Sequence, residues 1–429
     1  MADKKQTGIL NRTIFSMDNL PVLRGMETGS VDLIYLDPPF NSNRNYSAPI
    51  GSEAAGAEFK DMWTFKDTDD AWWGDLAAEQ PDLYHVIGAA SAAGGDNDKA
   101  YCIYMAIRLL ELKRLLKPTG TLYLHCDQSM SHILKLILDA IFGADNFVDE
   151  VIWNYGTPSG GRAGQKVKKP VKAHETLLIY ASNYGEHTFN REYTPYSESY
   201  LKWFRHTDED GRKFQTRKRK GEIVRQYLDE SPGVPLSNVW SDIKQLYSQA
   251  GWFPNTKGNK EQTKYPTQKP LDLLRRIVKL SSNEGDMVLD PFCGCATTCL
   301  AAEDLKREWI GIDISPRAYE LITMRFKKEL EIFNVKIIHR TDVPTRSDQQ
   351  KRSKDIRRIL FGKQKGICNG CEYAFPYRNF HLDHITPRAA GGQDTDDNLQ
   401  LLCGACNSVK GVRSMEHLRA QLRKDGIIK

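Results

Sequence analysis

The chain has 429 residues, of which 40% are hydrophobic and 27% are charged, and this balance is typical of a folded protein with two or three domains. That composition excludes a disordered tail or a coiled coil, and no apolar run reaches the roughly 20 residues that a membrane-spanning helix needs. Because the N-terminus runs into polar residues instead of the apolar core of a signal peptide, we expect a cytoplasmic protein.

The net charge of +5 conceals three segments of unequal charge. Residues 46–100 carry 3 Lys and Arg against 11 Asp and Glu, whereas residues 155–221 carry 14 against 7 and the tail from Arg346 carries 16 against 9. A charged segment is commonly a solvated surface, but the two basic segments are also candidate nucleic-acid contacts. The acidic segment would repel DNA, so we expect an outward-facing loop or a dimer contact there.

The first half of the chain predicts alternating strands and helices. Residues 31–36 form an apolar run that reads as a buried strand, and two prolines stop it. A helical pattern at 100–116, a strand at 121–127, a helix at 129–142 and a strand at 147–154 follow. This alternation predicts an α/β fold in which helices cover both faces of a mostly parallel sheet.

Residues 155–264 lack regular periodicity apart from a strand at 176–180, which indicates an insertion. Regular character returns with helices at 271–280, 297–305 and 316–333 and with strands at 287–289 and 309–312. Residues 336–354 are polar and form the candidate linker. We therefore expect one domain over 1–335 and a second over 355–429.

A candidate cofactor site lies where two predicted strands end. The segment from Asp290 to Thr298 follows one strand, and a second strand ends in Asp313. In a doubly wound sheet this arrangement places a tight turn and an acidic residue at adjacent strand ends, where a nucleoside cofactor binds and an Asp accepts its ribose hydroxyls. There is no GxGxxG here, and an ordinary turn is the alternative.

The segment Asp37-Pro38-Pro39-Phe40 has the residue types that methylation of an exocyclic base amine requires. The Asp carboxylate and the Pro carbonyl are two hydrogen-bond acceptors for the NH2 group, and proline keeps the turn rigid. The aromatic ring can stack on a base that has been flipped out of the duplex. The alternative is a turn that only terminates the strand.

Together these segments resemble the amino-methylating DNA methyltransferases of the permuted beta class, over residues 8–335. Segments at 115–127, 145–155 and 265–270 add to the resemblance. It implies a class I fold that uses S-adenosylmethionine and has a doubly wound, mostly parallel sheet. It also implies that the catalytic residues are Asp37, Pro38, Pro39 and Phe40, and that the cofactor-binding residues are Asp290, Pro291, Phe292, Gly294, Thr297, Asp313, Thr267, Lys269 and Pro270.

Within this resemblance, Asp37 and Pro38 hold the target amine and Phe40 stacks on the base. Asp at the first position of the motif is more typical of adenine enzymes than of cytosine enzymes, so N6 of adenine is the expected target and N4 of cytosine is the alternative. The usual Ser-Gly after Gly294 is replaced by Cys295-Ala296, which are still small.

The insertion at 155–264 is then the expected target-recognition region for double-stranded DNA. Basic side chains bind phosphates, and Arg can read guanine edges. A solvated basic loop is the alternative. The candidate DNA-binding residues are Lys168, Lys169, Arg217, Lys218, Arg219 and Lys220.

Four of the nine cysteines form two CxxC pairs separated by 31 residues: Cys368, Cys371, Cys403 and Cys406. This spacing is typical of a structural zinc site with four thiolate ligands. A module of this size has a small core, so zinc is expected to supply much of its folding free energy.

Residues 355–429 also resemble an HNH endonuclease with zinc knuckles, a small ββα-type domain. The resemblance implies that His384 is the general base, that Asp383 and Asn407 bind one Mg²⁺-type ion, and that Asn398 fixes the loop that orients His384. Such an ion neutralises charge at the scissile phosphate. The alternative is a finger that only grips DNA.

The expected protein is therefore a DNA methyltransferase fused to an HNH endonuclease, as in restriction-modification or phage defence, and it could act as a homodimer. A methyltransferase with a DNA-clamping finger is the second reading. A binding protein in which both centres are inactive is the third, and the presence of Asp37, Pro38, Phe40, Asp383 and His384 disfavours it.

Overall fold

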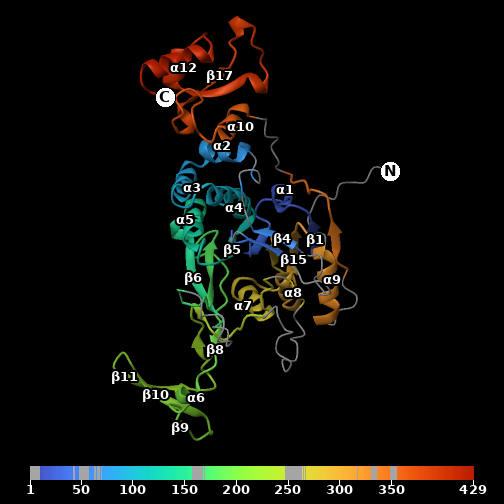
Figure 1. Cartoon of the computed structure of the whole chain (residues 1–429). Helices are drawn as coiled ribbons and strands as arrows, with labels where there is room; N and C mark the ends of the chain where they lie inside the picture. The colour runs from blue at the N-terminus through green and yellow to red at the C-terminus, as the bar shows by residue number, and fades with distance from the viewer. Residues whose placement is uncertain are drawn as a thin grey trace.

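The computed structural model describes residues 10–41, 44–47, 58–61, 64, 68, 70–156, 168, 170–246, 263, 265, 267–315, 317–329, 336–347 and 355–429. Within these ranges, no helix is both long and apolar enough to cross a membrane. Figure 1 shows a central sheet with its helices, a β-rich arm at one end and the C-terminal module at the other.

The described residues form a nine-stranded central sheet. Most neighbouring strands are parallel, and β7 runs antiparallel to both of its neighbours. In spatial order the strands are β13 (Val239–Trp240), β6 (Phe147–Asn154), β7 (His174–Ala181), β5 (Leu116–Cys126), β2 (Val31–Leu36), β14 (Met287–Asp290), β15 (Glu308–Asp313), β1 (Thr13–Ser16) and β16 (Ile338–Arg340).

The sheet is buried on both faces, as the continuous apolar run of β2 predicts. Successive side chains of a strand point to opposite faces. Leu33 and Tyr35 belong to one hydrophobic cluster, and Ile34 and Leu36 belong to the other. Two helical layers cover these faces (Figure 1): α1 (Asn19–Gly25), α4 (Asp96–Leu115) and α5 (Ser131–Phe142), with α3 (Pro81–Gly94) packed on them, and opposite them α7 (Leu271–Ser281), α8 (Thr297–Asp304) and α9 (Arg317–Glu329).

The expected α/β class with a mostly parallel sheet is confirmed, but two expected boundaries are wrong in detail. The insertion expected at 155–264 contains β7 and β13, which are strands of the central sheet. The linker expected at 336–354 begins with β16, which pairs in parallel with β1. Both short edge strands gain their stability from long-range pairing, for which the local sequence carries no signal.

The rest of the insertion forms an arm that stands away from the sheet (Figure 1). Its main feature is the antiparallel hairpin of β10 and β11, whose turn contains Lys220 and Gly221, both with positive φ. The arm contains β8 (Tyr193–Thr194), α6 (Glu198–Leu201), β9 (His206–Thr207), β10 (Lys213–Arg219), β11 (Glu222–Tyr227) and β12 (Val234–Pro235).

The C-terminal module is an antiparallel hairpin with helices around it. The hairpin strands β17 (Phe380–His384) and β18 (Leu399–Cys403) lead into α11 (Gly404–Lys410), which gives the expected ββα order. Helices α10 (Ile356–Lys363) and α12 (Met415–Lys424) flank this unit.

The acidic segment is not the outward-facing or dimer-contact loop that we expected over its described part. Two short strands, β3 (Arg44–Ser47) and β4 (Glu58–Asp61), pair with each other, and α2 (Asp70–Glu79), α3 and the start of α4 follow. Helix α2 packs against α10 of the C-terminal module (Figure 1). Arg358 of α10 lies 3.0 Å from Asp75 and 2.5 Å from Glu79. The acidic segment therefore faces the basic tail, and these opposite charges attract each other across the interface.

Aromatic rings continue this interface into the core. The Trp73 ring of α2 stacks on Tyr84 with 4.3 Å between the centroids, and Phe361 of α10 lies 6.1 Å from Tyr84. Trp73 and Phe361 are buried in one hydrophobic cluster that includes residues of both domains. The module is thus packed against the methyl-transfer domain expected from the sequence, and it is not merely tethered to it.

The close approach of α2 to α10 requires glycine at position 74. A Cβ atom there would lie 2.2 Å from the carbonyl oxygen of Arg358, whereas a Cβ at Gly88 of α3 meets no atom within 4 Å. We expect Gly74→Ala to lower the free energy of unfolding by about 1–3 kcal/mol. The matched control Gly88→Ala should leave it unchanged or raise it by up to about 1 kcal/mol. Urea unfolding measures both, and equal effects of the two substitutions would contradict the tight packing.

Candidate active site

Two strand ends bring the predicted catalytic and cofactor segments together. Strands β2 and β14 are parallel neighbours, with Leu33 opposite Val288. Asp37 follows β2 and Asp290 ends β14, so both lie at the same edge of the sheet although they are far apart in sequence. The chain leaves β2 towards β5 on one side and leaves β14 towards β15 on the other. Open α/β sheets bind ligands at such a switch point.

A cavity of about 800 Å³ lies at this edge. Its volume is within the range of pockets for small ligands and cofactors. Among the residues predicted for this site, only Pro270 does not line it, and Pro270 instead precedes α7 as its N-cap. The predicted residues that do line it are Asp37, Pro38, Pro39, Phe40, Thr267, Lys269, Asp290, Pro291, Phe292, Gly294, Thr297 and Asp313.

A left-handed turn shapes the floor of the cavity between β14 and α8. Gly294 has φ +51°, and a Cβ there would lie 3.0 Å from the Tyr265 ring. Asp313 Oδ2 accepts a hydrogen bond of 2.7 Å from the Gly294 N–H, and its Oδ1 accepts one of 2.8 Å from the Ser315 N–H. Each carboxylate oxygen keeps a lone pair, so Asp313 can still accept hydroxyl groups of a ligand. Burial raises the pKa of Asp313.

The sequence reading missed the cavity wall built around Arg108 of α4. The buried Arg108 side chain pairs with Asp18 at 2.9 Å and donates to Asn19 Oδ1 at 2.6 Å. Its guanidinium carbon lies 3.4 Å from the Tyr104 ring centroid and 5.7 Å from that of Trp72. The polar residues after the strand at Thr13–Ser16 were the available signal. Trp72 also connects two sites, because α2 carries both this cavity residue and the contacts to the C-terminal module.

Burial raises the pKa of Asp290 to about 7, against the opposing hydrogen bonds from Thr298 and the Phe292 N–H. Asp290 is therefore neutral below that pH and ionised above it. A cationic ligand such as S-adenosylmethionine, with its sulfonium and ammonium groups, is attracted more strongly to the ionised form. Its affinity should therefore increase as the pH rises through neutrality.

We expect the Kd for S-adenosylmethionine to fall roughly threefold to tenfold between about pH 6 and about pH 8, as measured by calorimetry. Asp290→Asn should flatten this dependence, because an amide does not ionise in this range. The control Asp272→Asn changes an exposed carboxylate of α7 and should preserve it. A steep pH profile that survives in Asp290→Asn would assign the titration to another group.

The catalytic side of the cavity contains a charged contact that the sequence did not predict. Lys269, expected to bind the cofactor, donates a hydrogen bond of 2.6 Å to Asp37 Oδ2. Its ammonium also lies 5.3 Å from the centroid of the Phe40 ring. Glu175 of β7 and His125 of β5 lie behind this contact. The sequence offered no local signal for these two, because they are single polar residues within apolar strands.

The predicted DNA-binding residues lie apart from the cavity. Arg217, Lys218 and Arg219 are exposed on β10, and Lys220 is exposed in the turn that follows. They gather on the protruding hairpin (Figure 1). Lys168 is exposed as well, and Lys169 lies outside the described residues.

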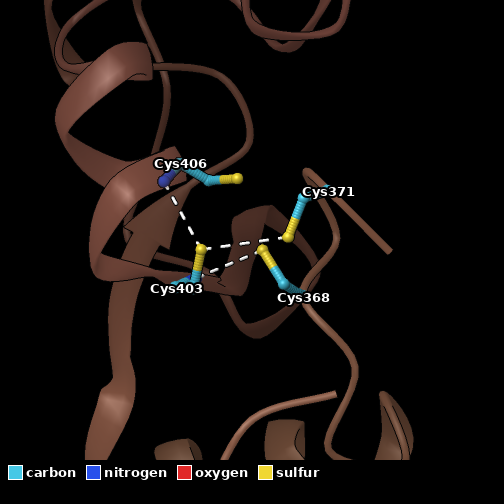
Figure 2. Close-up of side chains that lie close together, drawn as sticks. All are labelled: Cys368, Cys371, Cys403 and Cys406. Atoms are coloured by element: carbon cyan, nitrogen blue, oxygen red, sulfur yellow. Dashed lines mark hydrogen bonds between the residues drawn. The ribbon is translucent and has the colours of Figure 1, made fainter. Parts of the chain in front are cut away.

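The four cysteines of the two CxxC pairs converge in the C-terminal module. Figure 2 shows the sulfur atoms of Cys368, Cys371, Cys403 and Cys406 facing a common centre, and all lie within 4.8 Å of one another. Zn–S bonds of about 2.3 Å in a tetrahedron place the sulfurs about 3.8 Å apart. The Cys371 and Cys403 sulfurs lie 3.9 Å apart. The cluster therefore fits a tetrahedral zinc ion.

The HNH residues lie on the hairpin beside this cluster. His384 ends β17, and its Nε2 lies 2.6 Å from Asp394 Oδ1. Asp383 accepts hydrogen bonds from Gln400 and from the buried Lys410. Asn407 lies on the neighbouring helix α11. Asp394 was not predicted, because it lies in an irregular loop.

Asn398 bridges the loop after β17. Its side chain accepts from the Thr386 N–H at 2.9 Å and donates to the Thr386 and Gln393 carbonyls at 3.1 and 2.9 Å. These contacts close the loop that carries Asp394 against the end of the hairpin. The contacts are those that the predicted loop-fixing role requires.

The geometry is that of a nucleoside-cofactor cavity next to an acceptor-rich Asp-Pro-Pro-Phe segment, and family comparison agrees with it. Residues 31–324 match the N6/N4 family model described as DNA methylase, and residues 368–413 match the model described as HNH endonuclease. The chain therefore belongs to the N6/N4 DNA methylase family and carries a C-terminal HNH domain.

Characterised relatives are similar over most of the chain. Type II methyltransferase M.EcaI of Enterobacter cloacae is 24% identical over 74% of this chain and 69% of its own length. DNA adenine methyltransferase YhdJ of Escherichia coli is 26% identical over 71% of this chain and 79% of its own. The structure of TTHA0409, a DNA modification methylase of Thermus thermophilus complexed with S-adenosyl-L-methionine, aligns with a TM-score of 0.39 at 18% identity, over 75% of this chain and 97% of that one.

Proposed function

We propose that this DNA methyltransferase transfers a methyl group from S-adenosylmethionine to N6 of a flipped adenine in double-stranded DNA. The observation that carries the proposal is the position of Asp37. Its carboxylate stands at the end of β2, in the same cavity as the turn at Gly294 and the carboxylate of Asp313. The base site and the cofactor site thus share one wall.

The cavity residues fit S-adenosylmethionine chemically. Asp313 can accept ribose hydroxyls, Phe292 supplies an apolar surface, and Asp290 supplies negative charge for a cationic ligand. When bound, the cofactor supplies an electrophilic methyl group on a sulfonium that leaves as a neutral thioether.

The chain's own residues act on the amine. Asp37 and the Pro38 carbonyl accept its two N–H bonds, which fixes the NH2 group and directs its lone pair towards the methyl carbon. A new N–C bond forms as the S–C bond breaks, and the amine then loses one proton. Phe40 holds the base by stacking.

Adenine is favoured by Asp at the first position of the catalytic segment and by the similarity to an adenine methyltransferase. The experiment incubates purified protein with S-adenosylmethionine and genomic DNA, digests the DNA and separates the nucleosides by mass spectrometry. N6-methyladenosine is expected. N4-methylcytosine alone would overturn the choice of base but would preserve the reaction class.

Target recognition is assigned to the arm. Its hairpin carries the exposed residues Arg217 to Lys220 on a two-stranded ribbon, and such a ribbon fits the major groove. Lys168 and Lys169 would add phosphate contacts nearer the cavity.

The HNH domain is proposed to cut DNA. If the Nε2–H of His384 donates to Asp394, the other ring nitrogen is free to accept a proton from water. Asp383 and Asn407 would hold the Mg²⁺ ion, since carboxylate and amide oxygens suit a hard cation. Such an ion would share Asp383 with Lys410, whose ammonium lies 3.0 Å away. The alternative is a finger that only grips DNA, and a chain with both activities fits restriction-modification or phage defence.

We expect purified protein with Mg²⁺ to nick plasmid DNA, and His384→Ala to slow nicking at least about 100-fold. The matched control His381→Ala changes an exposed histidine of the same strand and should nick at the normal rate. If His384→Ala nicks as fast as the control, the domain cuts by other residues. If no protein nicks, the domain is a clamp.

Gel filtration with light scattering measures the proposed homodimer directly. A mass near the 48.8 kDa of a single chain would contradict it.

A further inference from the structure

Four segments of the fold converge on a buried charged cluster behind the catalytic carboxylate. It consists of Asp37 after β2, His125 of β5, Glu175 of β7 and Lys269 before α7. The Lys269 Nζ atom lies 2.6 Å from Asp37 Oδ2 and 3.8 Å from Glu175 Oε2. The Lys269 and Glu175 side chains are 8% and 10% exposed, and His125 is fully buried. A single ammonium therefore faces two carboxylates out of contact with bulk water.

The charges in this cluster are well defined. Burial by itself lowers the pKa of Lys269, but the Asp37 and Glu175 carboxylates outweigh it and raise the pKa. Burial opposes ionisation of Glu175, but Lys269 and His125 hold its pKa well below the usual value. Lys269 is therefore a cation and Glu175 an anion at neutral pH.

Glu175 is fixed more firmly than Lys269. His125 Nε2 lies 2.9 Å from Glu175 Oε2, and His125 Nδ1 lies 2.9 Å from the Tyr35 hydroxyl. Lys172 approaches the other oxygen, Oε1, at 3.4 Å. Lys269, by contrast, has a long flexible side chain that reaches either carboxylate with a small movement.

The position of the Lys269 ammonium conflicts with the binding of a target base. It donates to the carboxylate that must accept from the target amine, and it lies beside the ring of Phe40, on which the base stacks. Methyl transfer also places positive charge on the amine nitrogen, and an ammonium at hydrogen-bond distance would oppose this charge.

Resting on the proposed methyl transfer, we propose that Lys269 is a positioning residue that exchanges partners. In the empty site it holds Asp37 in place, and when the base enters it moves to Glu175, so that Asp37 can accept from the amine. Glu175 is the anchored acceptor for the displaced ammonium, and it is the nearest other carboxylate to Lys269 within the described residues.

The test is a double-mutant cycle on base entry. The duplex carries the recognition site found by modification mapping, with 2-aminopurine in place of the target base, and its fluorescence reports the flipped base in the cofactor-loaded enzyme. Glu175→Gln leaves Lys269 no second carboxylate, so we expect the flipped fraction to fall and KM for DNA to rise at least about fivefold. In Glu175→Gln/Lys269→Gln no ammonium blocks Asp37, so the flipped fraction should return to within about twofold of wild type, while kcat stays low.

A structural role for the two residues predicts the opposite, since the double variant would then be worse than either single variant. Lys269→Arg is the second variant, because its guanidinium pairs with Asp37 through two hydrogen bonds and should reduce base entry without loss of folding. Failure of the double variant to restore flipping in an enzyme that methylates DNA overturns the exchange alone. Absence of methylation by the wild-type protein overturns the proposed function itself.

Discussion

Replacing Asp37 with alanine is expected to lower kcat for methyl transfer to DNA at least about 100-fold, while the Kd for S-adenosylmethionine changes less than about threefold. Asp37 supplies an acceptor that the amine uses while its nitrogen becomes tetrahedral, and this acceptor acts in a cavity that largely excludes water. Removing it therefore affects the transition state more than the cofactor.

The protein should survive this change, because Glu175 remains as a partner for the Lys269 ammonium. The matched control is Asp82→Ala, which removes an exposed carboxylate of α3 and should leave both constants unchanged. Single-turnover transfer from labelled cofactor measures kcat, and calorimetry measures Kd. If Asp37→Ala retains more than about a tenth of the wild-type kcat, another residue holds the amine.

Loss of the zinc ligands is expected to have the largest effect on stability. Structural zinc supplies on the order of 10 kcal/mol in small zinc-bound modules. The module of residues 355–429 has few other means of fixing the loop that contains Cys368 and Cys371 against α11. Cys403→Ser should therefore unfold the module and abolish nicking.

The same substitution should leave methyl transfer largely intact, because the cavity takes all its described lining from residues before the module. The melting temperature of the whole chain should nevertheless fall, since α2 loses its packing against α10. Elemental analysis should find one zinc per wild-type chain and none in Cys403→Ser. The control Ser408→Ala, at an exposed position of α11, should keep both zinc and nicking. A wild-type chain without zinc would contradict the assignment.

Strand ends and paired cysteines were predictable because their signals are local. The apolar run before Asp37 and the strand before Asp290 are buried on both faces, so their sequences are continuously hydrophobic and their ends are marked by polar residues and proline. CxxC spacing likewise reports metal geometry within four residues. These local patterns were sufficient to predict the cofactor cavity and the cysteine cluster.

Contacts between distant segments were not predictable. Glu175 reaches Lys269 only because β7 inserts antiparallel between β5 and β6, and nothing near Glu175 in sequence indicates that pairing. The same holds for α2, whose acidic residues suggested a solvated surface until α10 was found against them. A charged residue in a segment gives no information about which opposite charge it meets.

The central claim is best tested by long-read modification mapping of DNA from cells that express the His384→Ala chain, in which cutting is disabled. The fold and the cavity predict N6-methyladenine at every copy of one short sequence, and its complete loss when Asp37→Ala is added. Unmodified DNA from cells that contain the folded, cofactor-binding protein would contradict the claim.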